Sequence, residues 1–174
     1  MRTVKSAVNC ICAGLLVVFW LLILASCGNT KRATKSTEIN ETTERDKKTS
    51  VLLKEALKYK NTSYKLGGTD SHGMDCSGLM VTSFKKIAVE LPRTSREQSG
   101  VGKEINKSEA AVGDLLFFET SGKAKGINHV GLITKIASNG QVTFIHSTLK
   151  AGVIEDTLDT PYYQKSFVKI MRVY

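Results

Sequence analysis

The chain has 174 residues, a formal net charge of +9, and 41% hydrophobic residues. This length suits one domain after an apolar N-terminus is set aside. Residues 50–174 carry +5 of the charge on scattered single lysines, without the basic and aromatic patches of a nucleic-acid-binding surface, so we expect no nucleic-acid partner.

Residues 1–26 predict a lipoprotein signal peptide. Arg2 and Lys5 precede an uncharged apolar stretch, and the segment ends on L-A-S-C at 24–27. This ending resembles the bacterial lipobox, in which the cysteine, here Cys27, is lipidated and becomes the new N-terminus. The alternative is an uncleaved transmembrane anchor, since about 18 apolar residues can just span a bilayer. Either way the rest of the chain is expected outside the cytoplasm and tethered to a membrane.

Residues 27–49 predict a flexible tether behind the lipidated Cys27. Between Gly28 and Thr49 only Ile39 has an apolar side chain larger than alanine, so the segment cannot bury enough surface to offset the entropy of ordering. Gly28 stands where inner-membrane lipoproteins of some bacteria have aspartate, which favours the outer membrane. We therefore expect a domain at 51–174, held in the cell envelope and facing the periplasm.

Cysteine usage leaves one thiol in that domain. Cys10 and Cys12 lie in the signal, and Cys27 would carry lipid, which leaves Cys76 without a disulfide partner. An unpaired cysteine in an exported protein indicates a reactive or intermolecular thiol. The alternative is a buried cysteine that packs as a small hydrophobic residue.

Helical patterns dominate the first half of the domain. A helix is predicted to start at Ser50, and a loop rich in turn-forming residues follows at 61–73. Asp75 can cap a second helix over 76–88. T-S-R-E-Q at 94–98 contains overlapping capping boxes, which predict a short third helix.

Strand patterns dominate the second half. Alternating or continuous apolar runs predict strands at 114–118, 129–136, 141–147 and 165–174. Helices followed by strands indicate an α+β domain with helices packed on an antiparallel sheet.

The predicted helix start gives Cys76 a chemical role. The unpaired N–H groups and the dipole at a helix N-terminus favour a negative charge. We therefore expect a lowered thiol pKa and a nucleophilic thiolate.

A thiolate nucleophile needs a histidine base, and the chain contains His72, His129 and His146. His72 lies in the loop and is expected to be exposed. His129 and His146 lie on two strands joined through Asn139-Gly140. A two-residue turn there would separate the rings by about 13 Å along the strand. A four-residue loop at 136–139, or a bulge with the same effect, would set His129 opposite His146, and we predict this register.

Six short sequence blocks follow one another along the domain. They are Y-K-L-G-G at 64–68, D-C-S-G-L at 75–79, L-P-R-T-S-R-E-Q at 91–98, G-D-L-L-F-F at 113–118, N-H-V-G-L-I at 128–133 and F-I-H-S at 144–147. Together they closely resemble the NlpC-type cell-wall cysteine peptidases, which have a papain-like fold. The resemblance extends from residue 51 to the C-terminus and includes P-Y-Y at 161–163.

The resemblance implies a role for several residues. Cys76 matches the nucleophile, His129 the general base and His146 the third polar residue of the triad. Tyr64 matches an oxyanion or substrate-contacting tyrosine. Asp75 and Ser77 match positions that bind the free amino end of the peptidoglycan stem peptide in some members.

The implied activity is hydrolysis of an amide bond in the stem peptide, either between γ-D-glutamate and the diamino acid or in a D,D cross-link. We expect a monomer with no cofactor and no metal. Two alternatives stay open: a zinc site formed by Cys76, His129 and His146, and a non-catalytic peptidoglycan-binding module on the same fold.

Overall fold

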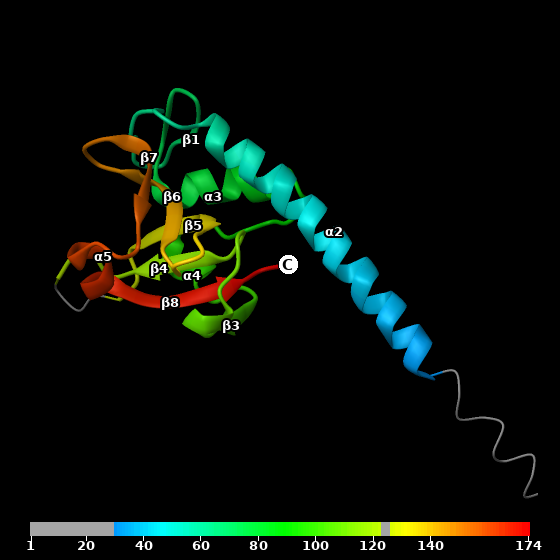
Figure 1. Ribbon diagram of the computed structural model, residues 1–174. Coiled ribbons are helices and arrows are strands. Elements are labelled where there is room, and N and C mark those ends of the chain that lie inside the picture. Colours follow the sequence, from blue (N-terminus) through cyan, green and yellow to red (C-terminus); the bar gives the residue numbers. More distant parts are fainter. Residues whose placement is uncertain (1–29, 123–125) are drawn as a thin grey trace, which may run out of the picture. The chain divides into compact units, whose positions relative to one another are not determined.

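The computed structural model describes residues 30–122 and 126–174, with side chains from residue 42 onward. The signal peptide and Cys27 lie outside these residues. The elements in chain order are α2 (Thr30–Lys58), β1 (Thr69–Asp70), β2 (Gly73–Met74), α3 (Cys76–Lys85), α4 (Ser95–Gln98), β3 (Lys103–Ile105), the 3-10 helix η2 (Lys107–Glu109), β4 (Leu115–Phe118), β5 (His129–Ile136), β6 (Val142–Thr148), β7 (Gly152–Thr157), α5 (Pro161–Ser166) and β8 (Phe167–Arg172) (Figure 1).

The first helix begins earlier than the sequence predicted. We expected a helix from Ser50 after an unstructured segment, whereas α2 begins at Thr30. Low hydrophobicity argues against burial but not against helix, and lysine, arginine and glutamate are good helix formers. One compact unit extends to Glu44, and the other comprises Arg45–Tyr174. The second unit therefore includes six residues before the predicted domain start at 51.

The predicted α+β class is confirmed. Six antiparallel strands form one sheet in the order β3-β8-β4-β5-β6-β7, and β1 and β2 form a separate two-stranded sheet (Figure 1). The predicted strands correspond to β4, β5, β6 and β8, and the predicted helices to α3 and α4. The predicted capping box is present, because Thr94 caps α4 reciprocally with Glu97. The sequence did not predict β3, β7 or α5.

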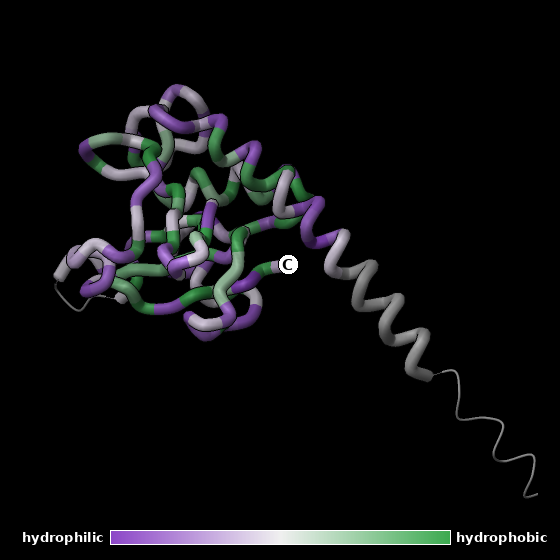
Figure 2. Tube along the Cα trace, viewed as in Figure 1, coloured by the Kyte–Doolittle hydropathy of each residue, from purple (hydrophilic) through white to green (hydrophobic). Residues whose placement is uncertain are grey.

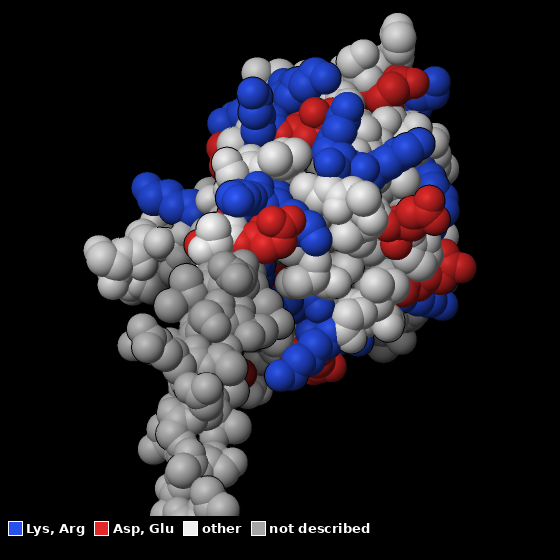
Figure 3. Space-filling view, turned by 90° about the vertical axis from the view of Figure 1, so that its right-hand side faces the viewer, with Lys and Arg blue, Asp and Glu red and all other residues white. Residues whose placement is uncertain are grey.

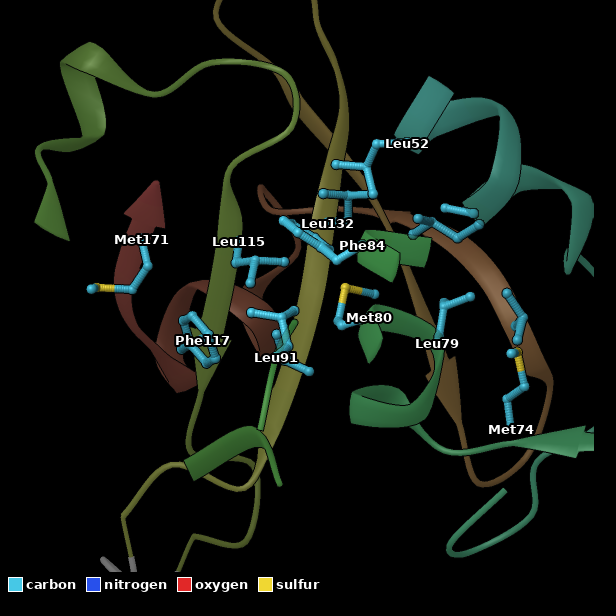
Figure 4. Packing of buried hydrophobic residues seen from close by; sticks show 14 of the residues in the cluster. Leu52, Met74, Leu79, Met80, Phe84, Leu91, Leu115, Phe117, Leu132 and Met171 are labelled. Atoms are coloured by element: carbon cyan, nitrogen blue, oxygen red, sulfur yellow. The ribbon is translucent and has the colours of Figure 1, made fainter. Parts of the chain in front are cut away.

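Both faces of the sheet are buried. Leu115 and Phe117 of β4 point to the face covered by α3, where they belong to one cluster with Met80 and Phe84 (Figure 4). The alternate residues of β4 belong to a second cluster on the other face. Because both faces are covered, β4 reads as a continuous apolar run, and the central strands are the hydrophobic part of the trace in Figure 2.

The surface carries mixed charge. On the face drawn in Figure 3, lysine and arginine side chains are interspersed with aspartate and glutamate. Within residues 30–122 and 126–174, no helix is long and apolar enough to cross a membrane.

A buried carboxylate joins the ends of the domain. Asp114, fully buried at the start of β4, accepts two hydrogen bonds from Arg172 at 2.7 and 2.8 Å. Arg45 of α2 donates to the same carboxylate at 3.2 Å. The N–H of Ala111 adds a fourth bond at 2.8 Å. Asp114 therefore ties α2 and β8 to the start of β4.

Replacing Asp114 by alanine is expected to lower the free energy of unfolding by about 3 kcal/mol, because two half-buried arginines lose their counter-charge. Urea unfolding of the variant and the wild type measures the difference. Glu104→Ala, at an exposed position on β3, is the control and should change stability by less than about 0.5 kcal/mol. A loss at Asp114 no larger than the control's would contradict the structural role.

Candidate active site

Cys76 is the first residue of α3, and Asp75 caps that helix. The Asp75 backbone is extended, and its Oδ1 accepts the N–H of Gly78 at 2.7 Å, which confirms the predicted cap. Gly78 lies against the preceding loop, since a Cβ there would lie 2.0 Å from the carbonyl oxygen of Gly68. The helix start and the loop before it are thus held together at close range.

The Asp75 carboxylate is fully engaged inside the protein. Arg93 donates to both of its oxygens, at 2.9 and 2.7 Å, and Gly67 N–H donates to Oδ2 at 2.8 Å. Ser77 donates its hydroxyl to Oδ1 at 3.2 Å and accepts from Arg93 at 2.9 Å. Burial alone would raise the pKa of Asp75, but Arg93 and the N–H donors outweigh it and lower the pKa. The carboxylate thus stays ionised beneath the nucleophile.

The β5–β6 hairpin has a different loop from the one predicted. Ala137 N–H donates to the carbonyl of Gln141, which leaves a three-residue loop at 138–140, with Gly140 at φ 84°. Beside the loop, Ile136 pairs with Val142, so the residue numbers of each pair sum to 278. A bulge between residues 133 and 135 changes this sum to 277, as in the pair 132 and 145.

The bulge decides whether the two histidines share a face. Without it His146 would oppose Leu132 and point away from His129. With it, the register extended by one residue sets His146 opposite Gly131, so His129 is its diagonal neighbour on the same face. The predicted four-residue loop and direct opposition are therefore wrong, whereas the bulge that was predicted as the alternative is present and brings the two rings into the predicted contact. His129 Nε2 lies 2.7 Å from His146 Nδ1.

A carboxylate extends the chain of contacts beyond His146. His146 is fully buried, and its Nε2 lies 3.0 Å from Oδ2 of Asp156 on β7. Ile154 pairs with His146 across the strands, so Asp156 is again a diagonal neighbour. Tyr163 of α5 donates its hydroxyl to the same oxygen at 3.0 Å. The sequence analysis missed Asp156 because β7 was not predicted, although the three β-branched residues of G-V-I-E-D-T at 152–157 were a usable signal.

A pocket of about 670 Å³ opens above these groups. Cys76 and His129 line it together, and the backbone N–H of Val130 faces the Cys76 thiol. Its other lining residues come mainly from the 147–151 segment, β7, α5 and the loops before β1 and β5: Tyr64, Thr120, Asn128, Ser147, Thr148, Leu149, Lys150, Ala151, Ile154, Tyr162 and Tyr163. A thiol and an imidazole therefore share one accessible wall.

The Cys76 thiol and the His129 imidazole both favour their neutral forms. Burial raises the pKa of the Cys76 thiol more than the hydrogen bond from the N–H of Val130 lowers it, and nearby Asp75 raises it further. Burial and His146 lower the pKa of His129 to about 3. The predicted lowering of the thiol pKa is therefore wrong, because desolvation outweighs the helix N-terminus. The arrangement provides a thiol beside a neutral imidazole.

The other predicted residues fall into three groups. Tyr64 lines the pocket, and burial, with Cys76 and Asp75 nearby, raises the pKa of its phenol, so it keeps a proton to donate. Asp75 and Ser77 are bonded to Arg93 and do not occur among the described residues of the pocket wall. His72 is exposed, as expected, beside Asp70.

The zinc alternative can be compared with the geometry. In the described part of the chain, no group of three or more histidine, cysteine, aspartate or glutamate side chains is placed to hold a metal ion. The arrangement instead corresponds to a thiol, a base and an orienting group.

Comparison with known proteins assigns the domain to a family. The family model described as the NlpC/P60 family matches residues 61–172. The protein named "Probable endopeptidase NlpC" of Escherichia coli (strain K12) is 32% identical over 161 residues, which cover 91% of this chain and 97% of the relative. "Murein DD-endopeptidase MepS/Murein LD-carboxypeptidase" of the same strain is 31% identical over 125 residues, with 71% and 62% covered.

Solved structures share the fold. A protein described as similar to lipoprotein, NLP/P60 family, from Staphylococcus aureus aligns with a TM-score of 0.64 and 31% identity. The alignment covers 74% of this chain but only 42% of that chain, so the present chain corresponds to less than half of the Staphylococcus protein. The NlpC/P60 domain of the peptidoglycan hydrolase SagA, with a TM-score of 0.58 and 25% identity, is covered to 97%.

The raised thiol pKa predicts slow alkylation at neutral pH. The rate at which iodoacetamide modifies Cys76 should rise with pH to a midpoint above the ordinary 9.0, because the thiolate is the reactive form. Cys76→Ser gives the background from other cysteines. A midpoint below 9.0 would contradict the uncharged resting pair.

Proposed function

The chain belongs to the NlpC/P60 family, and we propose that it is a cysteine endopeptidase that hydrolyses amide bonds in peptidoglycan stem peptides. The observation that carries this proposal is the shared pocket wall of Cys76 and His129, with His129 bonded to His146 at 2.7 Å. The names of the E. coli relatives, which include a murein endopeptidase, support the same substrate class.

The residue types define the first half of the reaction. Sγ of Cys76 attacks the amide carbonyl carbon while its proton moves to Nδ1 of His129, whose Nε2 faces His146. The carbonyl oxygen takes the negative charge and is stabilised by N–H groups at the start of α3 and by the hydroxyl of Tyr64. His129 then gives its proton to the leaving amine, and a thioester on Cys76 remains.

The second half releases the acid. His129 takes a proton from a water molecule as the hydroxide oxygen adds to the thioester carbonyl. The carbon–sulfur bond breaks, the proton returns to Sγ, and the carboxylic acid leaves. His146 accepts a hydrogen bond from His129 throughout and stabilises the transient imidazolium, which is the third-member role.

Two bonds in the stem peptide fit this chemistry. One joins γ-D-glutamate to the diamino acid, and the other is a D,D cross-link. The relative MepS is named for D,D cleavage, and "Bifunctional muramidase/DL-endopeptidase CwlT" of Bacillus subtilis, 40% identical over 112 residues covering 34% of that protein, is named for D,L cleavage. Both remain candidates for this chain.

The hydrogen bonds that Asp75 already makes affect how a substrate could bind. The family resemblance implies that Asp75 and Ser77 hold the free amino end of the stem peptide. In the structure Arg93 bonds to both side chains, so an incoming ammonium would have to share them with a guanidinium. Asn128, Thr120 and the other polar residues of the pocket wall offer contacts that need no such exchange.

The protein would act at the cell envelope as a membrane-anchored lipoprotein. Support comes from the L-A-S-C ending of the signal and from the lipoprotein description of the Staphylococcus structure. In this proposal lipid on Cys27 holds the monomeric domain through residues 28–49, facing the periplasm, with the outer membrane favoured by Gly28.

Cys76→Ala is expected to abolish cleavage, because no other described group in the pocket can replace the thiol. Purified protein incubated with defined muropeptides, analysed by mass spectrometry, should give two fragments with the wild type and none with the variant. Chelator should leave the rate unchanged. Equal cleavage by both proteins would defeat the proposed function, and binding without cleavage by both would favour the non-catalytic module.

Cys27→Ala is expected to prevent lipidation and to release the protein from the membrane fraction. Metabolic labelling with a fatty acid and immunoblotting of soluble and membrane fractions measure both effects. Cys12→Ala, inside the signal, is the control and should remain lipidated. Unchanged membrane retention of the Cys27 variant would support the transmembrane anchor instead.

A further inference from the structure

The hydrogen bonds beyond His146 fix where its proton lies. Asp156 Oδ2 lies 3.0 Å from His146 Nε2, and a carboxylate only accepts hydrogen bonds. If Nε2 carried a lone pair, it would face a negative oxygen at hydrogen-bonding distance, which is repulsive. The proton of the neutral His146 therefore lies on Nε2, and its Nδ1 is an acceptor.

The same reasoning passes to the next ring. Since Nδ1 of His146 is an acceptor, His129 must donate the 2.7 Å bond from its Nε2. The neutral His129 then has its lone pair on Nδ1. A base must present a lone pair to the thiol, so this is the form in which His129 can take the proton of Cys76.

We propose that Asp156 is a positioning residue that, two hydrogen bonds away from His129, sets the proton positions of His146 and His129 and leaves the base ready to accept. The effect of Asp156 on the reaction rate rests on the proposed peptidase function, whereas its effect on the proton positions of the two histidines does not depend on the substrate. Asp156 is not among the described pocket-lining residues, and it reaches the pocket wall through its hydrogen bond with Tyr163.

Tyr163 holds the carboxylate in place. Its hydroxyl donates to Oδ2 of Asp156 at 3.0 Å and lies 3.4 Å from His146 Nε2. The hydroxyl, the carboxylate oxygen and the ring nitrogen therefore all contact one another. Its backbone N–H is bonded to Thr160, which caps α5, and its ring packs 5.0 Å from that of Phe144. Asp156 is otherwise one-third exposed, so this fixed phenol restricts its rotamer.

The carboxylate also supports the charge that forms during catalysis. When His129 becomes an imidazolium, it donates to His146, and His146 in turn donates to Asp156. Each bond in such a chain polarises the next, so the negative charge on Asp156 stabilises a positive charge it does not touch. A neutral amide of the same shape would keep the packing and remove this support.

The first test observes the ring nitrogens. The chain has three histidines, so the full-length protein, labelled with 15N-histidine and purified in detergent, gives three ring systems. A His72→Gln sample identifies the exposed ring. In the wild type, both His129 and His146 should carry their proton on Nε2, and the Nε2–H proton of His146 should resonate downfield, as expected for a bond to a carboxylate. In Asp156→Asn this signal should move upfield or disappear.

The second test measures rates on the muropeptide. Asp156→Asn should lower kcat by about tenfold to 100-fold with KM within about threefold, less than the ~10⁴-fold loss seen when the lost carboxylate contacts the catalytic histidine directly. Tyr163→Phe keeps the carboxylate and should lower kcat by less than about fivefold. The matched control is Glu155→Gln, the same change on the adjacent residue, whose carboxylate is bonded to Lys60 and Thr134; its kcat should stay within about twofold of wild type.

The outcomes separate the two proposals. A wild-type proton on Nδ1 of either ring, an unchanged His146 signal in Asp156→Asn, or a kcat equal to that of Glu155→Gln would each overturn the role of Asp156. If the wild type cleaves no muropeptide, the peptidase function fails, and the ring-nitrogen spectra alone then decide the proton positions.

Discussion

The position of Cys76, the nucleophile we propose, depends on one buried carboxylate. Asp75 caps α3, accepts a bidentate pair from Arg93 and accepts the N–H of Gly67, so one side chain joins the loop before β1, the helix start and the segment before α4. Because breaking a buried ion pair leaves an uncompensated charge, this joint resists separation more strongly than a surface contact would. Cys76 is the next residue, so the hydrogen bonds of Asp75 also fix the position of Cys76.

The position of the base depends on strand register. Along β5, β6 and β7, each functional side chain is a diagonal neighbour of the next, so His129, His146 and Asp156 share a face of the sheet. A one-residue change of register turns every side chain to the opposite face. The bulge beside Ile133 supplies that change once, between the loop and the histidines. Gly131 completes the arrangement, since a Cβ there would lie 2.5 Å from the ring of Phe144, which packs 4.7 Å from that of His146.

Local sequence signals predicted the features that depend on a few neighbouring residues. The Asp75 cap, the Thr94 capping box and the apolar strands of the sheet centre all follow from short-range patterns, and they are present. A bulge was one predicted alternative, but its position could not be predicted, because a bulge leaves no mark in the alternation of side chains until the partner strand is known. The ionisation of Cys76 was predicted in the wrong direction for a related reason. The helix start is visible in the sequence, but the burial that outweighs it comes from distant segments packed around the thiol.

Because Cys76 and His129 are both neutral at rest, the hydrogen bonds that run from His129 through His146 to Asp156 matter for the proposed reaction. In a site where thiolate and imidazolium already exist at rest, the orienting groups only maintain an ion pair. Here burial disfavours both charges, so in the mechanism we propose the charge separation is created during attack, when His129 takes the proton. The groups that stabilise it at that moment are His146 and, through it, Asp156. Interactions that strengthen only as charge develops lower the barrier without stabilising the resting state. A protonated thiol is also less readily oxidised than a thiolate, which suits a lone cysteine on the exported domain we propose. The same burial that slows the unassisted thiol thus protects it, and the chain of bonds to Asp156 supplies the stabilisation that burial removes.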